Sequence, residues 1–375
     1  MADLTNESRK AFHELLDCLR EIDERWLGPE WNLTSSADVA EGFRNLMHLL
    51  QGGLVGHFED DALHPRFRRI VTPTRKFMGD NADAIYYDAP VDPSRVYRVR
   101  GRMDGAVYVS ITIEAGAAEG RFASNTAGVL NDSQFDVAAD GSFELRVGGP
   151  PQARNYLALP PGSARITTRH YFEEARSAAA DPTRHLALEI ETTPRVAPGE
   201  FVGDAGVAAG IRRVANFLRG RTLEQPPMAN RPQPPFVSIV PNQFPQPVKP
   251  GDFAFAAADA AYSMAPYVIG PDQALVVRAR WPRCRCANVD LWNRHMQTYD
   301  YANRQVSRNR KQTHLEPDGS FRMLLAHRDP GLPNWIDTEG RPFGLVFWRF
   351  MLPEGPIETP RARVVPFAEL SRNPA

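Results

Sequence analysis

The chain carries one β-rich sequence pattern twice, with corresponding positions about 180 residues apart. Each copy contains, in the same order, an apolar strand with arginines, an Asp-Gly-Ser-Phe turn, an Asn-aromatic pair and a long terminal strand. The first copy consists of Val96–Arg102, Asp140–Val147, Asn155–Tyr156 and Ala164–Phe172, and the second of Leu275–Trp281, Asp318–Leu325, Asn334–Trp335 and Gly344–Met351. A period of this length indicates a duplicated domain, because a solenoid unit is far shorter. The sequence therefore predicts two similar β-domains packed together with a cleft between them.

The strand patterns inside the first copy are short and are separated by Gly, Asp and Pro turns, which favours an antiparallel sandwich over βαβ units. We expect a mainly β protein with helical additions, in which two tandem, related, jelly-roll-like antiparallel β-sandwiches follow a helical N-terminal cap. The expected strands of the first sandwich include Val107–Ile113, Ser133–Val137, Ser142–Val147 and Leu186–Thr192. The expected domains are the cap at 1–63, the first sandwich at 64–203, a helical and Pro-rich connector at 204–268 and the second sandwich at 269–375.

Helical periodicity appears in four places. Thr5–Trp26 and Ser36–Leu50 are amphipathic and form the predicted cap, and Asp204–Arg219 follows the first sandwich. A further helix is expected near Asp252–Tyr267, so that helix introduces each sandwich. Between these last two, Glu224–Pro250 holds nine prolines and reads as an extended connector over the surface.

Charge and composition exclude several classes of partner. The 44 basic residues nearly balance the 45 acidic ones, so we expect no nucleic-acid partner. No apolar run reaches the length of a signal peptide or a membrane span, so we expect no membrane partner and a cytoplasmic location. Three cysteines cannot build a disulfide framework. A small molecule is the expected ligand or substrate, and the chain could also form a homo-oligomer.

Common cofactor and metal signatures do not occur. The histidines are scattered without HxH, HxxxH or HExxH spacing, and Cys284 and Cys286 have no second pair, so no metal site is expected. The motifs for dinucleotides, nucleoside triphosphates and the serine-hydrolase elbow are missing as well. We therefore expect chemistry without a cofactor.

The second copy also resembles a known family over about the last 110 residues of the chain. The similar segments are Asp290–Tyr301, Asn309 with Gln312, Ala326–Gly340 and Val346–Phe350. They carry a Trp followed by a Tyr-containing strand, a DGS turn, an Asn-Trp pair and a terminal strand with an Arg. In these features the chain resembles the bacterial domain-of-unknown-function family 1214.

This resemblance implies a β-sandwich, often with a related sandwich upstream, and it implies no activity. The segment Thr72–Arg102 is similar to the upstream part of longer members. One departure is that many members have a Pro two residues after the Asn-Trp pair, where this chain has Ile336 and Asp337. The loop at this point need not serve the same purpose.

The densest group of polar and aromatic side chains follows one strand of the second copy. It contains His327, Asp329, Asn334, Trp335 and Asp337. His327 could shuttle a proton while Asp329 or Asp337 orients it, and Trp335 could stack on a sugar or aromatic ring. A structural interpretation is equally physical: Asp329 belongs to a turn sequence, Asn334 could satisfy loop backbone groups, and Trp335 could plug the end of the sandwich.

A second group lies in the segment 72–90. Arg75, Asp80, Asn81 and Tyr86 place a cation, a carboxylate, an amide and a phenol within a dozen residues. Together with Asp83, Asp80 could divide acid and base roles if burial separated their pKa values. The carboxylates could equally form an Asx-type turn, and Tyr86 could simply pack.

Arginines and aromatic residues on the strands give the last candidates. Arg100 lies between two other arginines on one strand face, and Arg349 lies near the end of the second copy. Such arginines can grip a carboxylate, sulfate or phosphate, or can pair with Asp and Glu on a solvated face. Trp292 and Tyr299 could contact a ligand, although their alternation is also typical of core packing.

Two hypotheses about function follow. The first is a cofactor-independent enzyme that acts on a glycoside, a polyol or an aromatic or alicyclic catabolite by general acid–base hydrolysis or elimination in the cleft between the sandwiches. His327, Asp329 and Asp80 would handle protons. The second is a non-catalytic protein that binds a carbohydrate or an anionic ligand in the same cleft. The predicted binding residues are Arg75, Asn81, Tyr86, Arg100, Trp292, Tyr299, Asn334, Trp335 and Arg349.

Overall fold

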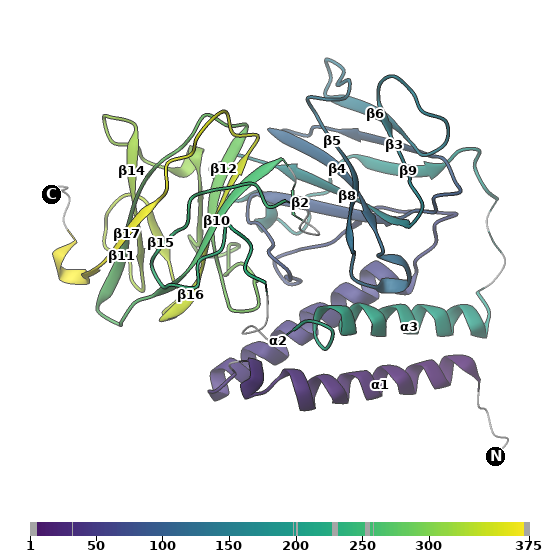
Figure 1. Ribbon diagram of the computed structural model, residues 1–375, viewed down its shortest axis with the longest axis horizontal. Helices are drawn as coiled ribbons and strands as arrows, with labels where there is room; N and C mark the ends of the chain where they lie inside the picture. The colour runs from purple at the N-terminus through teal and green to yellow at the C-terminus, as the bar shows by residue number, and fades with distance from the viewer. Residues whose placement is uncertain are drawn as a thin grey trace.

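The computed structural model describes residues 6–31, 33–197, 199, 202–226, 232–251, 256–257 and 259–370. Within these residues, three long helices form one layer and most of the strands form four sheets, paired as two sandwiches (Figure 1). The sandwiches stand side by side, and the helices lie along one end of the first. The predicted fold class, mainly β with two tandem sandwiches and a helical N-terminal part, is confirmed.

The helical layer consists of α1 (Glu7–Trp26), α2 (Ser36–Gly53) and α3 (Asp204–Arg221). α2 continues directly into a π-helical turn, η2 (Leu54–Phe58). The layer buries its own apolar core, which includes side chains from all three helices. No helix in the described part of the chain is long and apolar enough to cross a membrane.

Local sequence signals set the ends and the pairing of these helices. The Asn6 side chain caps α1 by accepting a hydrogen bond from the Arg9 backbone N–H. α2 begins with a capping box in which Ser35 and Asp38 satisfy each other's backbone N–H groups. α3 runs beside α1 in the same direction, since Arg212 contacts Glu14 and Arg219 contacts Glu21.

The first sandwich pairs a five-stranded sheet, in the order β1-β2-β8-β4-β5, with a four-stranded sheet, in the order β7-β6-β3-β9. Its strands are β1 (Arg68–Arg69), β2 (Ala84–Pro90), β3 (Tyr97–Arg102), β4 (Tyr108–Ala115), β5 (Asn125–Asn131), β6 (Ser142–Val147), β7 (Tyr156–Leu157), β8 (Ser163–Tyr171) and β9 (Leu188–Thr192). The inner faces of both sheets meet in one apolar core.

The second sandwich pairs two four-stranded sheets, in the orders β10-β16-β12-β13 and β15-β14-β11-β17. Its strands are β10 (Ala260–Val268), β11 (Gln273–Arg280), β12 (Cys286–Trp292), β13 (Ser307–Asn309), β14 (Ser320–Ala326), β15 (Trp335–Asp337), β16 (Phe343–Met351) and β17 (Arg361–Pro366). Short 3-10 turns lie at η1 (Pro29–Trp31), η3 (Ala118–Gly120), η4 (Ala178–Ala180), η6 (Arg310–Gln312) and η7 (Phe367–Glu369).

Strands β2 to β9 correspond one to one with β10 to β17, because both sandwiches have the same sheet orders. Each also has a single parallel pair, β6 with β7 and β14 with β15. The two repeat asparagines lie just before the short parallel strand in each copy. Asn155 and Asn334 have positive φ angles of 52° and 59°, a backbone region that asparagine tolerates better than most residues. The duplication seen in the sequence is therefore a duplication of topology.

Two predicted elements are wrong. The helix expected near residues 252–267 is instead β10 from Ala260 onward, which pairs with β16 over nine residues, while 252–255 and 258 lie outside the described residues. The second sandwich thus begins before residue 269. The expected strand at 133–137 is not a strand, because the Ser133 backbone N–H donates to the Asn131 side chain and turns the chain after β5.

The five-stranded sheet of the first sandwich and the β10-β16-β12-β13 sheet of the second face each other across an apolar interface. Tyr108 and Tyr171 of the first sandwich share a buried cluster with Tyr262, Trp292 and Phe347 of the second. The helical layer also contacts the second sandwich, where Arg294 lies 2.7 Å from Asp38 of α2. The second sandwich therefore contacts both the first sandwich and the helical layer.

Candidate ligand-binding site

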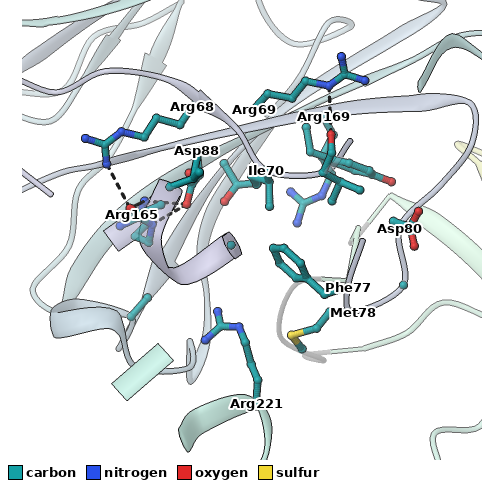
Figure 2. Close-up of a pocket in the computed structure, with 18 of the residues that line it drawn as sticks. Arg68, Arg69, Ile70, Phe77, Met78, Asp80, Asp88, Arg165, Arg169 and Arg221 are labelled. Carbon is teal, nitrogen blue, oxygen red and sulfur yellow. Dashed lines mark hydrogen bonds and ion pairs between the residues drawn. The ribbon is translucent and has the colours of Figure 1, made fainter. Parts of the chain in front are cut away.

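A cavity of about 140 Å³ lies where the first sandwich, the helical layer and the second sandwich meet (Figure 2). Strands β2 and β8 form one wall, since alternate residues of a strand face the same side. Tyr86 and Asp88 come from β2, and Arg165, Thr167, Arg169 and Tyr171 come from β8. The helical layer contributes His57, Phe217 and Arg221, the segment before β2 contributes residues 68–71 and 77–80, and the second sandwich contributes Tyr262 and Arg349.

Cations dominate the charged part of the lining. The described lining residues include seven arginines and only two aspartates. The arginines are Arg68, Arg69, Arg121, Arg165, Arg169, Arg221 and Arg349, and the aspartates are Asp80 and Asp88. The surroundings of each guanidinium decide which of them could hold a ligand.

Three of these arginines, Arg165, Arg169 and Arg349, are buried and lie beside carboxylates. Arg165 donates to Asp88 at 2.7 Å and to Asp60 at 2.9 Å. Arg169 donates to Thr112 at 2.6 Å and lies 3.4 Å from Glu114. Buried, paired arginines of this kind fix the wall of a site, because removing one partner leaves an uncompensated charge.

Arg349 repeats the position of Arg169 in the second sandwich. Arg169 on β8 pairs across to β4, and Arg349 on β16 pairs in the same way to β12. Arg349 donates to Asp290 at 3.1 Å. The duplication has thus repeated the arginine but not its acid, because Asp290 stands where the first copy has Thr112, and Arg169 reaches Glu114 two residues further along β4.

Backbone carbonyls already surround Arg69. Its guanidinium donates to the carbonyls of Val71, Ala179, Asp181, Pro182 and Arg184. Arg68 donates to the carbonyls of Gly56 and Glu59 and lies 4.0 Å from Asp60. Both side chains serve mainly to hold the segment before β2 in place.

Arg221, in the last turn of α3, has no carboxylate partner among the described residues. Its guanidinium stacks 3.6 Å from the Phe217 ring and donates one hydrogen bond, of 3.3 Å, to the Phe217 carbonyl. Its Nε atom is buried and has no hydrogen-bond partner within the described residues. Burial and the nearby Arg165 lower the pKa of Arg221 to about 9. Figure 2 shows the side chain reaching from α3 towards the rest of the lining.

The titratable groups of the lining are shifted towards their neutral forms. Burial, with the nearby arginines, lowers the pKa of His57 well below its ordinary value, so the imidazole is neutral at pH 7. Burial also raises the pKa of Asp80 and of Asp88 and raises that of Tyr86 well above its ordinary value. No group of three or more His, Cys, Asp or Glu side chains in the described part of the chain could hold a metal ion.

Of the residues predicted from the sequence, Asp80, Tyr86 and Arg349 line the cavity. Asp80 accepts a hydrogen bond of 2.8 Å from the Thr298 backbone N–H, and its second oxygen has no partner within the described residues. Tyr86 packs edge to face against Tyr171. The segment 72–90 therefore does contribute to a cavity at the domain junction.

Four other candidates lie elsewhere. Trp292 is 1% exposed, stacks on Phe347 and donates to the Asp80 carbonyl, so its ring is a core element. The Tyr299 hydroxyl is 2.8 Å from that of Tyr267 inside the second sandwich. The remaining two are Arg75, which donates to the carbonyls of Ile70 and Arg69, and Arg100, which pairs with Glu191 on an outer sheet face.

The loop after β14 does not line this cavity, and the two predicted loops do not converge there. His327 contacts the Thr338 hydroxyl at 2.6 Å, and Asp329 is exposed and accepts from the Gly331 N–H in a turn. Asn334 accepts from the His314 N–H and donates to two carbonyls, while the Trp335 indole donates to the Ala326 carbonyl. These contacts match the structural interpretation of this loop.

A buried polar network joins the two sandwiches behind Arg349. The Asn288 amide nitrogen donates to Asn81 at 2.6 Å and lies 3.1 Å from an oxygen of both Asp83 and Asp290. The Asn309 amide donates to the other Asp83 oxygen at 3.0 Å. One amide with two N–H groups faces three acceptors, so a proton on Asp83 or Asp290 completes the network.

Sequence reasoning missed His57, Asp88, Arg165 and Arg221. The alternation of Arg165, Thr167, Arg169 and Tyr171 along β8 was the available signal, because it places two arginines on one face of a strand. Nothing in the local pattern around Arg221 distinguishes it from the exposed arginines of the same helix.

Comparison with known proteins shows the fold. An uncharacterized protein from Burkholderia cenocepacia matches with a TM-score of 0.80 at 27% identity, over 96% of this chain and 98% of that one. A protein from Vibrio parahaemolyticus, at 12% identity, covers 86% of this chain and all of its own, with a TM-score of only 0.47. No family model matches the chain, and no curated protein matches it. The chain thus has the overall fold of the Burkholderia protein.

Proposed function

We propose that the protein binds a small organic anion in the arginine-lined cavity. The observation that carries this proposal is Arg221, a cation at the cavity wall without a carboxylate partner among the described residues. The side chain is partly buried and its Nε–H has no partner within the described residues, so an anion from outside the chain would supply one. The aromatic and aliphatic lining supports an organic ligand over a bare inorganic ion.

General acid–base catalysis in the same cavity is the second candidate. His57 favours it, because its imidazole lines the cavity in the neutral form, the form that a general base needs before it accepts a proton. Of the three residues predicted to handle protons, Asp80 lines the cavity and is buried. A hydrolase or a lyase would therefore use His57 or Asp80, and product formation from a bound anion would distinguish such an enzyme from a binding protein.

A thermal-shift comparison of charged and neutral compounds tests the proposal. Wild type and Arg221→Met are screened against carboxylates, sulfates and sugar phosphates, each with a neutral analogue. Arg212→Met is the matched control, because Arg212 lies on the exposed side of the same helix and pairs with Glu14. Anions should raise the midpoint of wild type and of the control but not that of Arg221→Met.

Without ligand, Arg221→Met should melt higher than wild type, because methionine removes a poorly compensated cation from the cavity wall. A variant that melts higher and still responds to anions as wild type does would contradict the proposal.

The cytoplasmic location and the relation to family 1214 remain part of this proposal. A homo-oligomer is part of this proposal as well.

A further inference from the structure

The two ends of the cavity differ in how their arginines are compensated. At the end formed by the second sandwich, Arg349 is paired with Asp290, while Arg169 on β8 reaches Glu114, which is opposite Arg165 in the register of β4 and β8. At the helical end, Arg165 forms ion pairs with both Asp60 and Asp88. Arg221 has no carboxylate partner among the described residues. Arg121, which follows η3 beside α3, is exposed and also has no carboxylate partner among the described residues. The cavity therefore offers unpaired guanidinium groups to the acidic group of a ligand at its helical end.

Side-chain contacts and the register of β2 and β8 give the position of the helical end of the cavity. Arg221 stacks on Phe217, the Phe217 ring lies 4.8 Å from that of His57, and His57 Nδ1 lies 3.4 Å from Arg165, so Arg221 and Arg165 belong to the same end. In the register of the sheet, Asp88 is opposite Thr167, and Tyr86 is opposite Arg169, two residues further along. Two residues of extended strand span roughly 7 Å.

The opposite end carries aromatic side chains. Tyr86 and Tyr171 have ring centroids 6.2 Å apart, and Tyr262 of the second sandwich lines the same part of the cavity. Phenol rings offer apolar contact and edge-to-face packing to another ring. The 140 Å³ volume is close to the roughly 150 Å³ of a cavity known to hold one benzene molecule.

We infer that the ligand is a monoanion built on a single six-membered ring, with its acidic group at Arg221 and its ring between Tyr86 and Tyr262. This inference rests on the proposed function and adds the size, charge and orientation of the ligand. A second acidic group on the ligand would lie near arginines that already have carboxylates beside them. A second ring would make the ligand larger than the cavity.

Calorimetric titration of the full chain tests the inference with a small set of probes. Benzoate and cyclohexanecarboxylate have the expected size and charge. Benzamide is the neutral analogue, terephthalate adds a second carboxylate, 2-naphthoate adds a second ring, and acetate has no ring. Each probe is titrated into wild type, Arg221→Met and the control Arg212→Met.

Benzoate and cyclohexanecarboxylate should bind about tenfold or more tightly than benzamide, since a hydrogen bond to a charged group carries at least this much. They should also bind more tightly than terephthalate, whose second carboxylate meets paired arginines, than 2-naphthoate, whose second ring exceeds the cavity, and than acetate, which makes no ring contacts. The affinity of Arg221→Met for benzoate should be about tenfold or more below that of wild type, and the affinity of Arg212→Met should be unchanged. Tyr86→Ala should enlarge the ring end and admit 2-naphthoate.

Failure of the inference about the ligand and failure of the proposed function give different results. If anions bind and depend on Arg221 but terephthalate, 2-naphthoate or acetate matches benzoate, the inference about the ligand is wrong while the proposed function stands. If no anion binds, or if binding is the same in Arg221→Met as in wild type, both are wrong.

Discussion

Replacing Asp83 by Asn should remove a large pH dependence of stability. Asp83 is 2% exposed and lies at the junction of the two sandwiches, where Asn288 and Asn309 donate to it. Burial, together with the nearby Asp290, raises the pKa of Asp83 to about 7 in the folded protein. Its ordinary value in the unfolded chain is 3.8. The folded protein therefore holds a proton on Asp83 that the unfolded chain releases.

The sign and size of the effect follow from this difference. Because the folded pKa is raised, the neutral side chain contributes its full stability below about pH 4, and this contribution is lost as the pH rises through about 7. About three pKa units correspond to roughly 4 kcal/mol, of which about 3 kcal/mol falls above pH 5. Asn cannot ionise, so Asp83→Asn should not show this loss.

Urea unfolding followed by tryptophan fluorescence at about pH 5 and about pH 8 measures the difference. Between these conditions, wild type should lose about 3 kcal/mol more of its free energy of unfolding than Asp83→Asn, whatever constant offset the substitution adds. Asp290→Asn is the contrast, because it leaves Arg349 without its acid and should destabilise the protein at both values. Parallel pH profiles for wild type and Asp83→Asn would refute the assignment of a proton to Asp83.

Three further substitutions test the account of the junction and of the loop after β14. Asn334→Ala should lower the free energy of unfolding by about 2–4 kcal/mol, because it removes three hydrogen bonds at a positive φ, and Asn334→Gly should recover part of this in the same urea assay. Arg349→Met should lower the free energy of unfolding by about 3–5 kcal/mol in that assay, because Asp290 stays buried without its partner. A decrease below about 1 kcal/mol would contradict the pairing. His327→Ala should change stability by less than about 1 kcal/mol and leave anion binding in calorimetry unchanged, whereas a loss of binding would place His327 in the site.

The duplication was readable from the sequence because its signals are local. Asp140 and Asp318 each accept from the backbone N–H and the hydroxyl of a serine two residues later, which fixes the same turn in both copies. Asn155 and Asn334 fix the same positive φ. Turn chemistry and strand alternation need no knowledge of distant contacts, so four landmarks in register were enough to predict two related sandwiches.

The predicted helix before the second sandwich failed for the opposite reason. Alanine-rich sequence around Ala260 and Ala261 is typical of helix, but the partner strand of this segment lies some 80 residues further along the chain. Pairing with β16 buries both faces of β10, including Tyr262 and Tyr267. In such a segment, tertiary contacts override the helix propensity of the alanines. The local sequence does not predict these contacts.

The site was only partly predictable because its lining comes from distant parts of the chain. Asp80, Tyr86 and Arg349 were candidates on residue type, and they do line the cavity. Arg221 looks like an ordinary basic residue in the last turn of a helix, where cations are favourable for reasons unrelated to ligands. Its lack of a carboxylate appears only once α3 is packed against the wall that carries Arg165.

A crystal structure of the protein grown with benzoate tests the central claim most directly. The account predicts density for one ring inside the cavity, between Tyr86 and Tyr262, with the carboxylate within hydrogen-bond distance of Arg221. An unoccupied cavity at a benzoate concentration that saturates binding in solution, or a carboxylate bound away from Arg221, would contradict it.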